Sequence, residues 1–282
     1  MRHGRRRRAG PWRITLAAAF VLVVLSVAIH FRAPAAIPAK AASGTLRVAT
    51  YNMRAGLGGV DEVAEDLRPL GADVIALQEV ERGVRRSKRV DQAESLAVAL
   101  DMRAEYAASF AFQSGEHGIA ILSRFPLSDV RTIRLPQGTG KWPRVAIAAR
   151  IDAPRPFRFV CVHLARPWGW PGSNLRARLG QIRFLLSELE DETLPLVIAG
   201  DFNSLPFSLE AMAMLRRFDT TWDPWRDGWA TSFSLSTIGF PTGSIRIDHV
   251  YVDESWTTRG SWVAPPGASD HRAVIADLVP RR

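Results

Sequence analysis

Short apolar runs recur along the chain from residue 46 onward, and most of them have the length and β-branched content of buried strands. They predict strands at 46–52, 73–79, 118–123, 144–151, 157–163, 196–199, 245–252 and 273–278. Apolar residues at helical spacing predict helices at 60–70, 91–100 and 175–189. The sequence contains no internal repeat. Because strands outnumber helices and the two kinds of element are interspersed, we expect a layered α/β structure.

The strand predicted at 196–199 is followed by Gly200, Asp201, Phe202 and Asn203. Because alternate residues of an extended chain point to the same face, the side chains of Asp201 and Asn203 are expected to emerge together. A carboxylate and a carboxamide on one face can accept a proton and hold an oxygen, which suits the positioning of water or phosphate. Asp and Asn also favour turns, so an ordinary turn at the strand end is the alternative.

Polar side chains also stand at or near the ends of other predicted strands. The full set is Asn52, Glu79, His163, Asp201, Asn203, Asp248, Asp270 and His271. Oxygen ligands on a rigid edge suit a hard cation such as Mg²⁺, whereas zinc is disfavoured because the chain has no HExxH or CxxC pair. Taken singly, His163 could be a core histidine and Asn52 a strand-end cap. The set as a whole indicates a metal-dependent site.

The net charge of +9 belongs to the N-terminal tail. Of the 37 basic residues, eight lie in residues 1–45, which contain no acidic residue, and the other 29 are matched by 28 acidic residues in 46–282. The body therefore lacks the charge bias that indicates a nucleic-acid-binding protein. The single cysteine, Cys161, excludes an internal disulfide framework and lies in an apolar run typical of a buried thiol.

The N-terminal segment has the pattern of a membrane anchor. Five arginines lie within the first eight residues, and residues 14–31 carry no formal charge apart from the titratable His30. We expect a basic cytoplasmic tail at 1–13, a transmembrane helix at 14–31 and an Ala/Pro-rich linker at 32–45. A cleaved signal peptide is the alternative, because residues 39–41 have the small-x-small form of a cleavage site. Both interpretations place 46–282 outside the cytoplasmic membrane, either tethered in a single pass or secreted.

Seven motifs resemble the signature series of the endonuclease/exonuclease/phosphatase superfamily, in that family's order. They are TYNM at 50–53, LQE at 77–79, GIAILSR at 118–124, VHL at 162–164, GDFN at 200–203, RIDH at 246–249 and SDH at 269–271. The resemblance implies that 46–282 forms the DNase I-like fold, a four-layer α-β-β-α sandwich. This superfamily includes bacterial sphingomyelinases.

The resemblance also implies metal-dependent hydrolysis of phosphoester bonds, with Mg²⁺ as the cofactor and Mn²⁺ as its alternative. Glu79 would be the principal metal ligand, with Asn52 and Asp270 beside it. A cation in this place would offset charge on the phosphoryl oxygens.

The remaining residues of the set would act on water and phosphate. Asp201 and Asn203 would orient the attacking water and the phosphate, and His163 would donate a hydrogen bond to a phosphate oxygen. His271 would form a hydrogen-bonded pair with Asp248, whose carboxylate favours the charged imidazolium. Either Asp201 or His271 could be the general base.

Departures from the family pattern bear on the substrate. Some secreted nucleases of the family carry an arginine two residues after the metal-binding glutamate, and Glu81 in that position would repel phosphate. Either Glu116 or His117 stands where some relatives carry a carboxylate partner for His163. A basic run follows Glu81 and could contact an anionic substrate or lipid headgroups, or form a solvated loop; it comprises Arg82, Arg85, Arg86, Lys88 and Arg89.

Tryptophans suggest a further substrate contact, since they are dense at 168–170 and again at Trp222, Trp225 and Trp229. They suit interfacial lipid contact, base stacking or packing at the edge of the core. Three functions follow. The first is a membrane-anchored phosphoesterase, expected to be a monomer, whose substrate is a lipid headgroup or a small phosphoester. The second is an exported nuclease, and the third is a binding module on an inactive hydrolase scaffold.

Overall fold

The computed structural model describes residues 36–38, 42, 44–138, 140–166, 173–240 and 242–281. The predicted transmembrane helix at 14–31, the candidate cleavage site at 39–41 and the tryptophans at 168 and 170 lie outside these residues. Within the described ranges, no helix is both long and apolar enough to span a bilayer.

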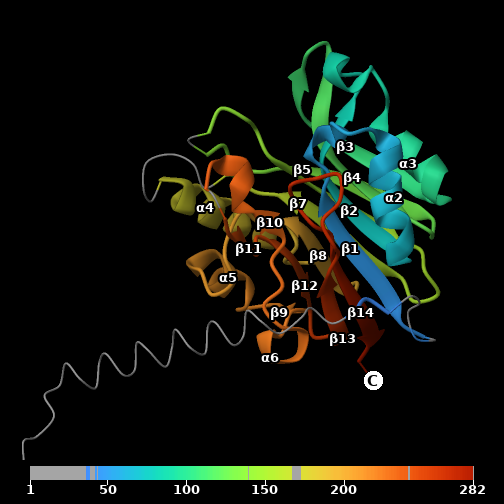
Figure 1. The fold of residues 1–282 in the computed structure, drawn as a ribbon. Coiled ribbons are helices and arrows are strands. Elements are labelled where there is room, and N and C mark those ends of the chain that lie inside the picture. Colours follow the sequence, from blue (N-terminus) through green and yellow to red (C-terminus); the bar gives the residue numbers. More distant parts are fainter. Residues whose placement is uncertain are drawn as a thin grey trace, which may run out of the picture.

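Two six-stranded sheets pack face to face, with helices on both outer faces (Figure 1). The first sheet has the order β13-β14-β1-β2-β4-β3 and the second has the order β5-β6-β7-β8-β12-β9. Within each sheet one central pair is parallel, β1 with β2 and β7 with β8. This arrangement confirms the predicted α-β-β-α sandwich.

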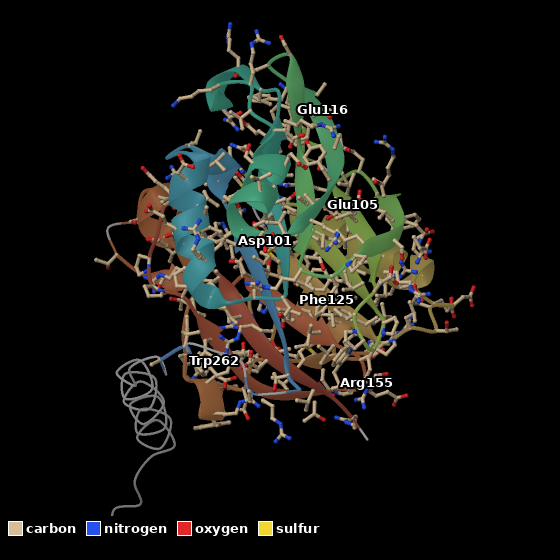
Figure 2. The ribbon with its side chains drawn as sticks, turned by 90° about the vertical axis from the view of Figure 1, so that its right-hand side faces the viewer. Asp101, Glu105, Glu116, Phe125, Arg155 and Trp262 are labelled. Atoms are coloured by element: carbon tan, nitrogen blue, oxygen red, sulfur yellow. The ribbon has the colours of Figure 1, made fainter. Side chains whose placement is uncertain are left out.

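Each of the two large sheets contains six strands. The first sheet contains β1 (Leu46–Asn52), β2 (Val74–Arg82), β3 (Arg103–Phe112), β4 (Gly115–Ser123), β13 (Trp256–Val263) and β14 (Val274–Pro280). The second contains β5 (Leu127–Arg134), β6 (Val145–Ile151), β7 (Phe157–His163), β8 (Leu196–Asp201), β9 (Asp219–Thr220) and β12 (Asp248–Val252). A separate pair consists of β10 (Phe233–Ser234) and β11 (Ser244–Ile245). The hairpin of β3 and β4 carries Glu105 and Glu116, which Figure 2 labels.

Helices α2 (Val60–Leu67) and α3 (Gln92–Leu100) cover the first sheet, and α4 (Ser173–Glu188) and α5 (Leu209–Met214) lie on the side of the second. The short helix α6 (Pro224–Asp227) contacts β13, and single turns of 3-10 helix lie at Arg54–Gly56, Arg68–Leu70, Arg85–Ser87 and Leu235–Ile238.

Three apolar clusters separate the four layers. On β1, Val48 faces the other sheet whereas Ala49 and Tyr51 face α2, as the two-residue period of a strand requires. A third cluster joins the second sheet to Ile182 and Leu185 of α4. Because the central strands are buried on both faces, they read in the sequence as continuous apolar runs.

Apart from β10 of the separate pair, the strands that the apolar pattern did not predict lie at the sheet edges. They are β3, β5, β9 and β13, the terminal strands of the two sheets. Edge strands carry polar and charged side chains that discourage pairing with other chains, so they lack a continuous apolar run. The prediction of one strand over 245–252 was wrong, because β11 ends at Ile245 and β12 begins only at Asp248.

Arg47 forms the most buried ion pair of the first sheet. Its guanidinium donates to both carboxylate oxygens of Asp277 on β14, at 2.7 and 2.9 Å, and also to the carbonyl oxygens of Leu70 and Pro38. The Arg47 side chain is fully buried and that of Asp277 is nearly so. Removing one partner of such a pair leaves an uncompensated charge in the interior.

We therefore expect Arg47→Met to lower the free energy of unfolding by about 3–5 kcal/mol in urea titrations. The double variant Arg47→Met/Asp277→Leu removes both charges and should recover at least half of that loss. A single variant within about 1 kcal/mol of the parent chain would contradict this account of the pair.

Candidate active site

A cavity of about 840 Å³ lies where the two sheets meet, and six of the eight predicted residues line it. These six are Asn52, Glu79, Asp201, Asn203, Asp270 and His271. The other two stand behind the wall: His163 lies against Asp201, and Asp248 bonds to His271. Residues up to 219 positions apart in the sequence are thus brought to one site.

Asn52, the last residue of β1, links the two sheets at the cavity. Its Nδ2 donates to Asp201 Oδ2 on the second sheet, at 3.1 Å, and to Glu79 Oε1 on the first, at 3.4 Å. Its Oδ1 accepts from the backbone N–H of Arg54 at 3.1 Å. The amide is therefore fixed between two carboxylates.

Glu79 lies at a bulge inside β2, and not at the end of the strand as the sequence suggested. The pairing of β2 with β4 shifts between Gln78 and Val80, and Glu79 itself has a φ of 57°. A bulge redirects one side chain without ending the strand. Burial alone would raise the pKa of Glu79, but the charges of Arg166 and His117 hold it below its usual range.

Asp201 and Asn203 are held by a local turn. Asp201 Oδ1 accepts from the backbone N–H of Asn203 at 2.8 Å, and Asn203 has a φ of 50°, so the chain is not extended here as predicted. Both side chains nevertheless line the cavity. The glycine before them is required by space, because a Cβ on Gly200 would lie 2.0 Å from the carbonyl oxygen of Val162.

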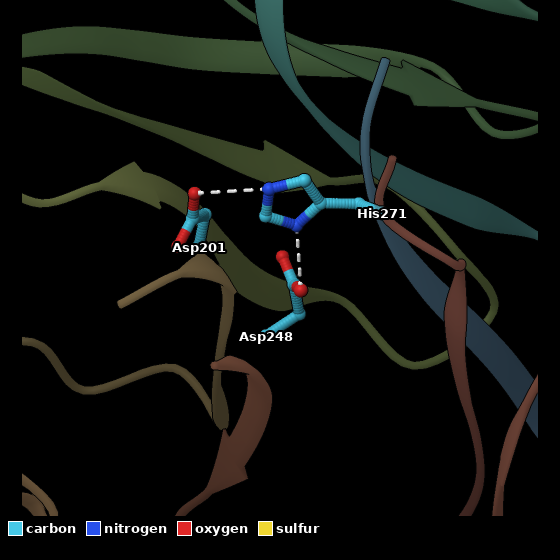
Figure 3. Close-up of side chains that lie close together, drawn as sticks. All are labelled: Asp201, Asp248 and His271. Atoms are coloured by element: carbon cyan, nitrogen blue, oxygen red, sulfur yellow. Dashed lines mark hydrogen bonds and ion pairs between the residues drawn. The ribbon is translucent and has the colours of Figure 1, made fainter. Parts of the chain in front are cut away.

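His271 and Asp248 form the predicted hydrogen-bonded pair, with Nδ1 2.8 Å from Asp248 Oδ2 (Figure 3). The other ring nitrogen, Nε2, lies 3.9 Å from Asp201 Oδ2. Burial alone would lower the pKa of His271, but the charge and hydrogen bond of Asp248, with further negative charge from Asp201, raise it to about 9. The imidazole is therefore charged at neutral pH.

The pKa values of Asp201 and His163 are shifted in opposite directions. Burial and the charge of Asp248 raise the pKa of Asp201 to about 6, against the lowering effect of His271. Burial lowers the pKa of His163 well below its ordinary value, and the charge of Arg144 adds to this, so His163 is neutral. Its Nε2 lies 3.4 Å from Asp201 Oδ2 and has no hydrogen-bond partner within the described residues.

Four arginines that the sequence analysis missed line the cavity. Arg178 of α4 pairs with Glu210 at 2.7 Å. The other three are Arg166, Arg54 and Arg144. Arg166 donates to Glu79 Oε1 at 2.8 Å, and Arg54 Nε lies 3.6 Å from Asp270 Oδ2. Arg144 is only 8% exposed and forms no ion pair with any described residue, and burial lowers its pKa to about 10. A buried guanidinium beside a cavity favours an anionic ligand such as phosphate. All three stand within three residues of a strand end, which is the signal that could have identified them.

The structure corrects the interpretation of Glu81. Its side chain is fully buried, accepts from Arg86 Nε at 2.7 Å and lies 3.6 Å from His117 Nδ1. The charge is compensated and does not repel a phosphate in the cavity. Of the basic run that follows, Arg86 lines the cavity and Arg82 pairs with Glu116 on the hairpin. Neither Glu116 nor His117 bonds to His163 in the described structure.

Two groups of residues could hold a cation. Asp201, Asp248 and His271 offer ligand atoms within 4.8 Å of one another. A cation held by these three groups would have to replace the bond between His271 Nδ1 and Asp248 Oδ2, because a metal binds neutral imidazole. Glu79, Asn52 and Asp270 supply only oxygen donors at the cavity, and both carboxylates now face guanidinium groups, so this end of the site attracts positive charge. These donors fit Mg²⁺ or Mn²⁺.

Comparison with known proteins agrees with the resemblance that the sequence motifs show. The sequence model of the Endonuclease/Exonuclease/phosphatase family matches residues 49–271. The uncharacterized protein YbhP of Escherichia coli K12 is 27% identical over 175 residues, which are 56% of this chain and 67% of YbhP.

Solved structures share the fold. An endonuclease/exonuclease/phosphatase from Beutenbergia cavernae has a TM-score of 0.69 at 22% identity, covering 84% of this chain and 72% of that one. Sphingomyelinase C from Streptomyces griseocarneus has a TM-score of 0.62 at 17% identity, covering 83% and 99%.

The pair of His271 and Asp248 can be tested directly by an NMR titration of the metal-free protein in chelator. We expect the pKa of His271 near 9 in the parent chain. In Asp248→Asn it should fall toward or below about 6.5, because the buried ring loses its closest negative charge. Asp152→Asn, at the surface, is the control and should leave it in place. An unchanged pKa in Asp248→Asn would show that Asp248 does not hold the proton on His271.

Proposed function

Since the chain belongs to the endonuclease/exonuclease/phosphatase family, we propose that it is a metal-dependent phosphodiesterase acting on a lipid headgroup or a small phosphoester. Members of this family hydrolyse phosphoesters. The supporting observation is that one cavity offers both kinds of binding group that this reaction needs. Glu79, Asn52 and Asp270 provide oxygen donors for a cation, and the buried Arg144 provides positive charge for an anion.

The roles of the residues follow from their geometry. Glu79, Asn52 and Asp270 would hold Mg²⁺ or Mn²⁺, which when bound stabilises negative charge on the phosphoryl oxygens. Asp201 would accept the proton of the attacking water, because His271 faces a carboxylate at each ring nitrogen and so keeps both protons. Asn52 and the backbone of Asn203 orient the Asp201 carboxylate.

The phosphate would be bound on the side of the Asp201 carboxylate that faces away from the cation. Arg144 reaches the cavity from the start of β6 and can donate to non-bridging oxygens. His271, as a cation, would stabilise the charge that develops on the phosphoryl group. His163 lies behind Asp201, with its Nε2 3.4 Å from Asp201 Oδ2, and would support that carboxylate.

An exported nuclease is the second candidate, and the aromatic end of the cavity favours it. Phe110 stacks on Trp142 with ring centroids 4.5 Å apart, and Arg86 lies over the ring of Phe112 at 4.7 Å. Aromatic rings beside a cation can stack on bases. A panel assay of the purified protein with Mg²⁺ separates the candidates. The panel holds plasmid DNA, RNA, sphingomyelin, phosphatidyl lipids, inositol phosphates and an aryl phosphodiester, and failure to cleave any of them would support the non-catalytic binding module.

We further propose that residues 14–31 anchor the protein in the membrane with 46–282 outside. The arginine-rich tail before the apolar segment supports this orientation, and secretion after cleavage is the alternative. Protease added to spheroplasts should then digest the body. A body that is present in the cells but stays protected would contradict export.

Metal dependence is tested with Glu79→Gln. Activity should disappear in excess chelator and return with Mg²⁺ or Mn²⁺, because the proposed ligands are oxygens. Glu79→Gln should require a much higher metal concentration while its thermal unfolding stays close to that of the parent chain. Glu116→Gln, on the hairpin outside the cavity, is the matched control and should behave as the parent. Full activity in excess chelator would rule out the mechanism.

The role of Asp201 is tested with Asp201→Asn at saturating metal. This change keeps the shape of the side chain and removes its ability to accept a proton, so kcat should fall by about 10²–10⁴-fold. Asp152→Asn provides the matched control at the surface. A loss of less than about threefold at unchanged fold would exclude Asp201 as the base.

A further inference from the structure

The exposed large apolar side chains are concentrated in one segment. Thirteen such side chains are exposed within the described residues, and six of them lie between positions 207 and 229. We call this group the apolar surface; it comprises Phe207, Leu209, Met212, Leu215, Trp225 and Trp229. Clustering of this kind is typical of a site that contacts a protein or a membrane.

Several side chains of the apolar surface lie next to one another. Leu209 and Met212 lie three residues apart on α5 and therefore project from the same side of the helix, and Leu215 follows them. Phe207 is 65% exposed and has a φ of 66°. Because this backbone conformation is costly for a bulky residue, the loop imposes the outward position of Phe207. The ring of Phe207 lies 6.2 Å from that of Trp229.

A shallow groove joins these side chains. It has a volume of about 310 Å³ and is lined by Phe207, Leu215, Trp222 and Pro224 among others. Trp222 itself is buried and donates from Nε1 to the carbonyl oxygen of Gly228, so it packs at the edge of the core. It supports the exposed rings beside it.

The apolar surface borders the mouth of the active-site cavity. Leu205, two residues before Phe207, lines the cavity and is 49% exposed. On α5 the side chain of Glu210 faces the cavity and is buried, whereas Leu209 and Met212 face solvent. A flat partner on the apolar surface would therefore lie next to the entrance of the site.

The chain before the body limits how far the protein can stand from the membrane. Ile37 packs against the core and the carbonyl oxygen of Pro38 accepts from Arg47 at 2.7 Å, so the chain is attached to the body there. The apolar segment ends at residue 31, and five residues can span only about 18 Å. A transmembrane helix at 14–31 would hold this part of the body close to the bilayer.

The point of attachment and α6, which carries Trp225 of the apolar surface, both lie beside β13, the edge strand of the first sheet. Arg47 lies 5.8 Å from the ring of Trp262 on β13, which is labelled in Figure 2. On the same strand, the carbonyl oxygen of Thr258 accepts from Arg226 of α6. Figure 1 shows α6 beside β13, with α5 above it on the same side. The described residues 37 and 38 and α6 thus lie at one end of the sandwich.

We propose that the apolar surface docks on the outer leaflet of the membrane that carries the tether and presents the cavity to lipid headgroups. This proposal rests on the membrane anchoring proposed above. Trp, Leu and Met side chains suit the boundary between headgroups and acyl chains. The charged residues nearby are of both signs, Arg216 with Asp219 and Asp223, so docking should depend on apolar contact and persist at high salt.

The test uses the full chain, in which Cys161 is fully buried and does not compete for labelling. Met212→Cys and, separately, Leu209→Cys are labelled with an environment-sensitive fluorophore and reconstituted into phosphatidylcholine/phosphatidylglycerol vesicles. Val98→Cys on α3 is the matched control, because Val98 is apolar and 75% exposed but lies on the opposite outer layer. Lipids that carry a quencher in the acyl chain then report which labels contact the bilayer.

We expect a blue shift and at least twofold stronger quenching for the labels at 212 and 209 than for the label at 98, unchanged in 1 M salt. Equal quenching at the three positions would overturn the proposal, as would failure of the chain to associate with the vesicles. A blue shift without lipid quenching would show that a second copy covers the surface, and would also overturn it.

The quenching requires no turnover, so it is independent of the proposed hydrolysis. Cleavage of a soluble aryl phosphodiester by the same labelled proteins measures that activity separately.

Discussion

The site depends on the side-chain amide of Asn52, which among the described residues is the one polar group that bonds to carboxylates of both sheets. Glu79 belongs to the same sheet as Asn52, whereas Asp201 belongs to the opposite one. The distance between the cation-binding end and the proton-accepting end is therefore set by how the two sheets pack. The central apolar cluster fixes that packing, because Val48, Val74 and Val197 fill the layer between the sheets. The packing of the core therefore determines the geometry of the site.

Charge in the cavity is balanced pair by pair. Glu79 faces Arg166, Asp270 faces Arg54, and Asp248 bonds to His271. Arg144 is the exception among the cavity arginines of the described chain, since no carboxylate lies within ion-pair distance. Burying an unpaired guanidinium is costly, and binding of a phosphate would offset that cost. The family fold and the unpaired charge of Arg144 support phosphoester hydrolysis more strongly together than either does alone.

The sequence predicted the central strands and the composition of the site, because both depend on local patterns. Strands buried on both faces appear as apolar runs, and the polar residues that follow them are visible at their ends. Edge strands such as β3 and β13 have no such pattern. The position of Glu79 at a bulge depends on the pairing of β2 with β4, which is distant in the sequence. Glu81 is paired with His117 of the same strand β4, although its other partner, Arg86, is only five residues away. Arg54, Arg144 and Arg166 lie just outside the ends of strands, where apolar periodicity gives no sign that their side chains reach the cavity.

We propose that a cation binds at Glu79, Asn52 and Asp270 and leaves His271 bonded to Asp248. A crystal grown with Mn²⁺ and measured for anomalous scattering tests it most directly. We predict a single strong anomalous peak between the oxygens of Glu79 and Asp270. A peak between Asp201, Asp248 and His271 in its place, with the bond from His271 to Asp248 broken, would contradict it.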